Sequence, residues 1–199
     1  MKFEPDPPAD ASVAQGLAAL KRKGGSVLVV GAASGAQHDV CHRFLEGDDA
    51  HVFVDTDGPV RGNETATEVI ERPVPTRSSA AAGAPGGAAG IGSLAADLAT
   101  VMQDRGEETE SLRVCFDSLR PFVDATDLPS LVSALESLRE TARDVGAVVH
   151  FHLPAMPEAV PPALYDGVDA VVEVRRQSGT TYQRWRFPGE TESTEWVEV

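Results

Sequence analysis

Lysine is nearly absent from this chain, and the shortage of positive charge excludes several classes of function. Of the 199 residues, 17 are lysine or arginine and 31 are aspartate or glutamate, which gives a formal net charge of -14. The only lysines are Lys2, Lys21 and Lys23. A surface of this charge repels phosphate backbones and anionic lipid, so we expect neither a nucleic-acid partner nor a membrane partner.

Aromatic residues, cysteines and long apolar runs are also scarce. Aromatic residues make up 6% of the chain, so the core must rely on valine, leucine and alanine. The two cysteines, Cys41 and Cys115, are too few for a disulfide framework, and each lies in an apolar run that favours a small buried side chain. No apolar stretch approaches the ~18 residues of a membrane span, and the acidic, proline-rich start is unlike a signal peptide. We therefore expect a cytoplasmic protein.

The composition, which is acidic, poor in lysine and rich in alanine and glycine, is typical of proteins from a salt-accumulating cytoplasm. At molar salt the Debye length is about 3 Å, so the self-repulsion of an acidic surface is largely screened. We therefore expect the protein to lose helical circular-dichroism signal when it is dialysed into low salt. An undiminished spectrum in low salt would contradict this interpretation.

Predicted strands and helices alternate along the chain. Apolar runs predict strands at residues 26–30, 51–54, 67–70, 112–116, 147–152, 168–174 and 182–187. Apolar residues at helical spacing predict helices at residues 11–22, 37–45, 91–101 and 127–145. This alternation is typical of an α/β domain with a mainly parallel sheet, here followed by an antiparallel hairpin. Ligands of such sheets bind at the carboxyl ends of the strands.

The predicted domain spans residues 11–188. Residues 1–10 are expected to form a flexible tail, and residues 189–199 an acidic C-terminal tail. Within the domain, residues 72–90 are rich in alanine and glycine and are expected to form a low-complexity loop.

The loop after the first predicted strand has the general form of a phosphate-binding site, because glycines and a helix N-terminus present backbone N–H groups to an anion. The candidate nucleotide contacts are Gly31, Ser34, Gly35, Ala36, Gln37 and His38. A working P-loop reads G-x-x-x-x-G-K-[ST], and its lysine and hydroxyl contact the phosphates and magnesium. Counted from Gly31, the last three positions hold Ala36, Gln37 and His38, so both groups are missing. Phosphoryl transfer depends on such charges, so we expect at most weak nucleotide binding and no fast ATP hydrolysis.

Three aspartates follow strands at the same predicted edge of the sheet. Asp117 ends the strand at 112–116, as the aspartate of a Walker B motif does, and is a candidate magnesium ligand. Asp55 and Asp57 follow the strand at 51–54 and are, with Asp117, the candidate catalytic carboxylates. The alternative is that these aspartates only cap turns at strand ends, as is common in an acidic chain.

Three stretches, at residues 24–31, 112–119 and 166–175, resemble in sequence and order the RecA/KaiC-type P-loop ATPase domain. In that family they are the Walker A strand, the Walker B strand with its Asp-Ser, and a late core strand that leads into a hairpin. The resemblance spans about residues 12–188 and is greatest to short RecA-like proteins of halophilic archaea. It implies a mainly parallel, three-layer sandwich of the P-loop NTPase type with a C-terminal antiparallel hairpin.

The departures from the family pattern imply a different role from ATP hydrolysis. The Walker lysine and the magnesium-binding hydroxyl are absent, and Asp55 or Asp57 stands where active members tend to place a catalytic glutamate. The resemblance therefore implies a non-catalytic regulatory or protein-interaction domain, which associates with a protein partner or with itself.

Two other classes of function remain open. In the first, the chain is an ATP–Mg²⁺ hydrolase in which Gln37 or His38 and an arginine of a neighbouring subunit replace the lysine. In the second, it is an NAD(P)-binding protein, because residues 30–37 resemble the T-G-x-x-x-G-x-G opening of short-chain dehydrogenases and Asp55 lies near the expected ribose-binding acid. That resemblance lacks the third glycine and the Tyr-x-x-x-Lys motif, since no lysine follows Lys23.

Four histidines form two pairs with spacings suited to metal binding. His38 and His42 are four residues apart on a predicted helix, and His150 and His152 face the same side of a predicted strand. A RecA-like sheet would place that strand beside the first strand and bring both pairs toward one site. The alternative is a solvent-facing pair and a hydrogen-bonded core pair, because no cysteine or carboxylate motif completes a ligand set in the sequence.

Overall fold

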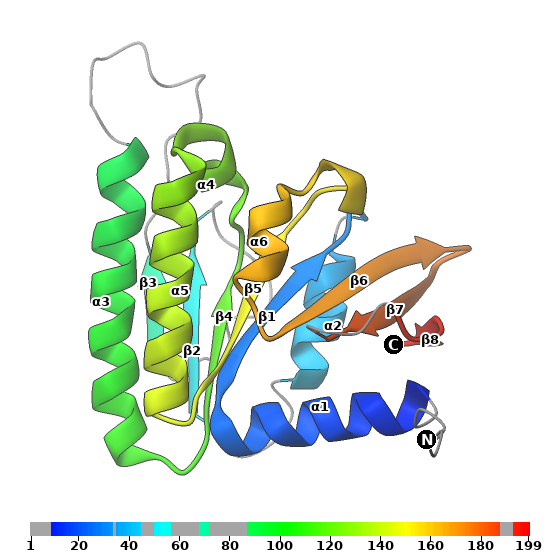
Figure 1. Ribbon diagram of the computed structural model, residues 1–199, viewed down its shortest axis with the longest axis horizontal. Coiled ribbons are helices and arrows are strands. Elements are labelled where there is room, and N and C mark those ends of the chain that lie inside the picture. Colours follow the sequence, from blue (N-terminus) through cyan, green and yellow to red (C-terminus); the bar gives the residue numbers. More distant parts are fainter. Residues whose placement is uncertain (1–8, 34, 45–49, 57–67, 72–86, 188–192) are drawn as a thin grey trace, which may run out of the picture.

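The protein folds around one eight-stranded sheet with helices on both faces (Figure 1). The computed structural model describes residues 9–33, 35–44, 50–56, 68–71, 87–187 and 193–199. The strands are β1 (Gly25–Val30), β2 (Ala50–Asp55), β3 (Glu68–Glu71), β4 (Leu112–Phe116), β5 (Val148–Leu153), β6 (Ala170–Gln177), β7 (Thr180–Arg186) and β8 (Val197–Glu198). The helices are α1 (Ala9–Lys23), α2 (Ala36–Phe44), α3 (Gly87–Glu108), α4 (Arg120–Ala125), α5 (Leu128–Asp144) and α6 (Pro162–Asp166), with a 3₁₀ turn at Pro157–Ala159.

The strand order is β3-β2-β4-β5-β1-β6-β7-β8. The first six strands in this order run parallel, and β7 and β8 are antiparallel to their neighbours. This arrangement confirms the predicted α/β class, with its mainly parallel sheet and C-terminal antiparallel hairpin. It also places β1 between β5 and β6, in the middle of the sheet, so the loop that leaves β1 lies at the centre of the edge where ligands bind in such folds.

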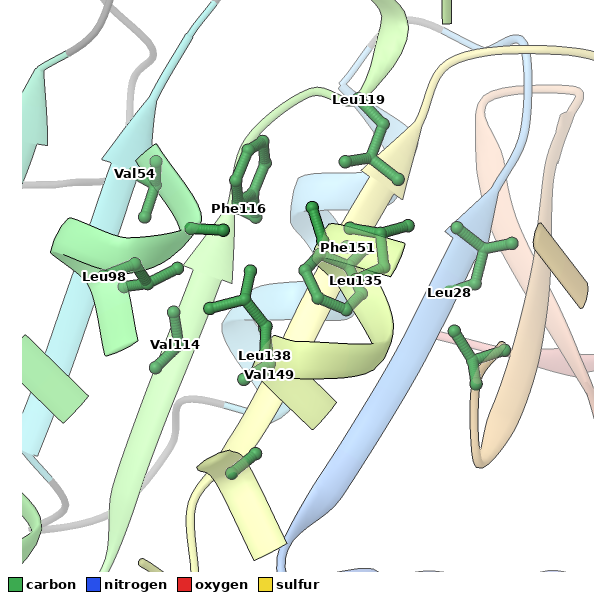
Figure 2. Packing of buried hydrophobic residues seen from close by; sticks show 14 of the residues in the cluster. Leu28, Val54, Leu98, Val114, Phe116, Leu119, Leu135, Leu138, Val149 and Phe151 are labelled. Atoms are coloured by element: carbon green, nitrogen blue, oxygen red, sulfur yellow. The ribbon is translucent and has the colours of Figure 1, made fainter. Parts of the chain in front are cut away.

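Alternate residues of the central strands pack on opposite faces of the sheet, which is why their sequences are apolar throughout. On one face, Leu28 and Phe151 join the larger cluster, which is covered by α3, α4, α5 and α6 (Figure 2). On the other face, Val27 and Val29 pack against residues of α1 and α2. The result is three layers, with α1 and α2 on one side of the sheet and α3, α4, α5 and α6 on the other (Figure 1).

The helix α5 shows how local sequence sets these elements. Its N-cap, Asp127, accepts a hydrogen bond from the backbone N–H of Ser130, and Pro129 lies in the first turn, where no N–H is needed. Its apolar face then buries Leu131, Leu135 and Leu138 in the larger cluster. No helix among the described residues is long and apolar enough to cross a membrane.

Three boundaries differ from the sequence prediction. Helix α1 begins at Ala9, inside the predicted tail at residues 1–10. Helix α3 begins at Gly87, inside the predicted loop at residues 72–90, because the alanines before Ile91 extend a helix whose buried face starts there. Strand β8 pairs with β7 within the predicted acidic tail. Residues 72–86 and 188–192 lie outside the described residues.

Candidate functional site

The loop between β1 and α2 is tied from within by Gln37. Its side-chain Nε2 donates hydrogen bonds to the carbonyl oxygens of Gly31, at 2.7 Å, and of Leu153, at 2.8 Å. These two acceptors follow β1 and end β5, so one amide group links adjacent strands. Gln37 is only 5% exposed, and both of its N–H groups are committed to the protein. In the P-loop pattern this position holds the lysine that reaches the phosphates.

The backbone of the same loop is also engaged in local hydrogen bonds. The N–H of Ala36 donates to the carbonyl of Ala33, and the N–H groups of His38 and Asp39 donate to the carbonyl of Gly35. Gly35 has a φ of +74°, the left-handed conformation that turns the chain into α2. A phosphate bound here would have to compete with these carbonyls for the N–H groups. Ser34, another predicted contact, lies outside the described residues.

The predicted carboxylates lie at the ends of β2 and β4. In the strand order, β5 separates these two strands from β1, which precedes the loop. Asp117 is 3% exposed, and its Oδ1 accepts a hydrogen bond from the backbone N–H of Thr56 at 2.9 Å. The Thr56 hydroxyl lies 2.5 Å from the same oxygen and 2.7 Å from the carbonyl of Ser118. Asp55 is likewise buried, and Asp57 lies outside the described residues. The contacts of Asp117 hold the ends of two strands together, as in the turn-capping alternative.

A cluster of thiols and imidazoles lies under α2, on the face opposite the larger hydrophobic core. The Sγ atoms of Cys41 and Cys115 are 3.2 Å apart. Cys41 Sγ is 3.9 Å from His150 Nδ1, and Cys115 Sγ is 3.8 Å from His152 Nε2. The ring of His38 packs against that of His152, with centroids 5.0 Å apart. We call these five residues the Cys–His cluster.

The topology explains why the members of the cluster meet. Cys115 of β4 is in register with His150 of β5, and His152 follows two residues later on the same face. Helix α2 then lays Cys41 and His38, three residues apart, over these strands. The predicted approach of the two histidine pairs is therefore found for His38 and His152. The side chain of His42, in contrast, lies outside the described residues.

The two cysteines are the part of this cluster that the sequence analysis missed. Each was interpreted as an isolated apolar residue, since nothing in the local sequence of Cys41 or Cys115 indicates a partner. The signal lies in the pairing of β4 with β5 and in the packing of α2, both of which depend on tertiary structure.

Burial sets the protonation states within the cluster. Desolvation lowers the pKa of His150, so its ring is neutral at physiological pH. The hydrogen bond between the two thiols lowers the pKa of Cys41 and raises that of Cys115, and burial raises the pKa of Cys115 further. The cluster thus combines a neutral imidazole with one thiol that ionises more easily than the other. Neutral imidazoles and thiolates are the forms that bind metal ions.

Comparison with known proteins supports the fold assignment. The structure is similar to that of a KaiC-like protein from the hyperthermophilic archaeon Pyrococcus horikoshii OT3, with a TM-score of 0.58 and 13% sequence identity. The similarity covers 88% of this chain and 85% of that one, and at this identity it confirms the RecA/KaiC-like fold alone. No protein with a curated description matches the sequence. A family model matches residues 24–174, and the chain therefore belongs to DUF7504, a family of unknown function.

Proposed function

We propose that this chain is a non-catalytic RecA/KaiC-like domain, which acts through contact with a protein partner or another copy of itself. The observation that carries the proposal is the hydrogen bonding of Gln37. The residue at the position of the Walker lysine is neutral, and both hydrogens of its amide are donated to Gly31 and Leu153. The loop has the outline of a nucleotide site but lacks a cation directed at the phosphates.

The size of the missing interaction favours this proposal over ATP hydrolysis. Removing one positioned donor from a transition state costs about 3 kcal/mol, or a factor of 10² to 10³ in rate, and a full charge on a phosphoryl group contributes at least as much. Here the lysine and the magnesium-binding hydroxyl are both replaced, by Gln37 and by His38, whose ring packs on His152. Turnover should therefore fall well below that of a working P-loop ATPase.

We expect no rise in melting temperature with millimolar ATP–Mg²⁺, ADP or NAD(P)H, and no release of phosphate from ATP, in molar salt. The test is sensitive, since a ligand present at 100 times its Kd stabilises a protein by about 2.7 kcal/mol. A thermal-shift assay measures the melting temperature, and a phosphate-release assay on the same preparation measures hydrolysis of ATP.

The control for that assay is a pair of substitutions that each remove one carboxylate charge. Asp117→Asn alters the candidate magnesium ligand, whereas Asp124→Asn alters an exposed residue of α4. Phosphate release that Asp117→Asn abolishes and Asp124→Asn leaves intact would refute the proposal. A shift with NAD(P)H alone would instead favour the dinucleotide-binding alternative.

The proposal leaves two kinds of partner, and one measurement separates them. Size-exclusion chromatography with light scattering in molar salt gives the mass of the particle in solution. A multiple of the chain mass supports self-association, and the mass of a single chain points to a different protein as the partner.

A further inference from the structure

We propose that four residues of the Cys–His cluster, namely His38, Cys41, Cys115 and His152, bind one metal ion of the zinc class between α2 and the sheet. Among the described residues, His38, Cys115 and His152 already form a group of three whose ligand atoms all lie within 4.8 Å of one another. Cys41, whose sulfur is 3.2 Å from that of Cys115, supplies the fourth ligand. This inference does not depend on the proposed partner-binding function.

The distances fit a tetrahedral site with little rearrangement. Zinc bonds of about 2.3 Å to sulfur and 2.0–2.1 Å to nitrogen place the ligand atoms of a tetrahedron roughly 3.3 to 3.8 Å apart. The pair Cys115 Sγ and His152 Nε2 is at 3.8 Å, and the two sulfurs are at 3.2 Å. Where two ligand atoms of the group of three lie farther apart than this, a movement of the His38 side chain would bring them into range. His38 can move most easily, because it is half-buried and lies at the start of α2.

The chemistry of the ligands selects the metal. Two thiolates and two imidazoles in tetrahedral reach favour zinc, whereas magnesium and calcium prefer sets made of oxygen. Within the cluster, His150 is placed as an outer contact, since its Nδ1 lies 3.9 Å from Cys41 Sγ and can orient that thiolate.

The burial of the imidazole and the sulfurs bears on the same site. His152 is fully buried, and the ring nitrogen that faces Cys115 Sγ is Nε2, the atom that would bind the ion. Both cysteines are buried beside it, so soft ligand atoms are gathered here away from water. A disulfide between Cys41 and Cys115 would account for the close sulfurs, but it would leave the gathering of His38 and His152 around them unexplained.

The site lies directly behind the loop that resembles a P-loop. His38 occupies the position at which a working P-loop carries the hydroxyl that binds magnesium, and Cys41 follows one turn later. In this chain, the start of α2 would thus hold a metal ion below the loop in place of a nucleotide above it. The ion would fix α2 to β4 and β5, so its binding should also stabilise the fold.

The test is a titration of the reduced, chelator-treated protein with Zn²⁺ and with Co²⁺ in high salt, monitored by competition with a chromophoric chelator and by absorption. We expect one equivalent per chain with submicromolar affinity, a thiolate-to-cobalt charge-transfer band, and a higher melting temperature with zinc. Cys115→Ser should remove the charge-transfer contribution of one thiolate and the tight binding. His38→Ala should weaken binding at least tenfold, and as a half-buried residue it is the variant least prone to unfold the protein.

The matched control is His51→Gln, which removes another buried histidine, located on β2 and outside the proposed ligand set. It should retain one tight equivalent. Three results would overturn the proposal: no uptake at micromolar zinc, a cobalt complex without a thiolate band, or binding that both Cys115→Ser and His38→Ala leave unchanged. Recovery of a Cys41–Cys115 disulfide, followed by no metal uptake after its reduction, would overturn it as well.

Discussion

Replacing Gly31 with alanine is expected to destabilise the protein by about 3 kcal/mol with no ligand present, the upper end of the usual cost of overpacking. A Cβ at this position would lie 2.3 Å from the carbonyl oxygen of Val174 and 3.1 Å from its carbonyl carbon. Both atoms belong to the backbone of β6, and Val174 is paired with Gln183 of β7 on its other side, so this backbone cannot move away locally.

The matched control is Gly35→Ala, in the same loop. Gly35 has a φ of +74°, but among the described residues no atom beyond its own chain neighbours and helix lies within 4 Å of where its Cβ would be. That substitution should therefore cost only the strain of the left-handed conformation, about 1–2 kcal/mol. Denaturant unfolding in high salt compares the two variants. If their free energies of unfolding fall with denaturant at the same slope, the difference between their midpoint concentrations measures the difference in stability. A Gly31→Ala variant no less stable than Gly35→Ala would contradict the assigned packing role.

The role of Gly31 is one that the sequence alone does not reveal. The sequence predicts that Gly31 contacts phosphate, because a glycine after a strand and before a helix is typical of phosphate-binding loops. The structure gives this glycine a packing reason that needs no ligand, the close approach of Val174. The sequence could not reveal that reason, because Val174 is brought to Gly31 only by the pairing of β1 with β6.

The fold itself was largely predictable, because strand and helix patterns are local. The continuous apolar run at residues 26–30 and the helical spacing at residues 127–145 each identify an element, β1 and α5, without information from the rest of the chain. The short helices Arg120–Ala125 and Pro162–Asp166 were not predicted, since five or six residues are too few to establish a helical period. They form because Phe122 and Leu164 each bury a side chain in the larger core.

The candidate site was predictable only in part, for the same physical reason. The resemblance to a RecA-like sheet predicted that the histidines of β5 would lie beside β1, and the register of the two strands confirms this. The contact between Thr56 and Asp117, and that between Cys41 and Cys115, join residues from different elements. Neither residue of such a pair carries a local signal of its partner, so these contacts had to be found in the structure.

The second large effect is expected for Gln37→Met, which keeps the length of the side chain but removes both hydrogen-bond donors. The carbonyl of Gly31 would lose its partner at 2.7 Å, and that of Leu153, which also accepts from the backbone N–H of Gly31 at 3.4 Å, would lose the shorter of its two hydrogen bonds. A buried polar group left unsatisfied costs about 1–3 kcal/mol, so we expect a loss of about 2 kcal/mol. Denaturant unfolding of the ligand-free protein in high salt measures it.

A companion variant, Gln37→Glu, tests whether the Gln37 amide stabilises the fold by donating hydrogen bonds to the carbonyls of Gly31 and Leu153. Burial against two carbonyl oxygens would raise the pKa of the new carboxyl above its unfolded value of about 4.3, because only its protonated form can donate a hydrogen bond. Ionisation then penalises the folded state alone, so Gln37→Glu should become less stable than Gln37→Met as the pH rises above that value. If Gln37 served a bound nucleotide instead, both variants would unfold like the parent protein and differ from it only in a ligand-dependent shift. The difference in free energy of unfolding between the two variants, measured as a function of pH, therefore shows whether Gln37 stabilises the fold or contacts a ligand.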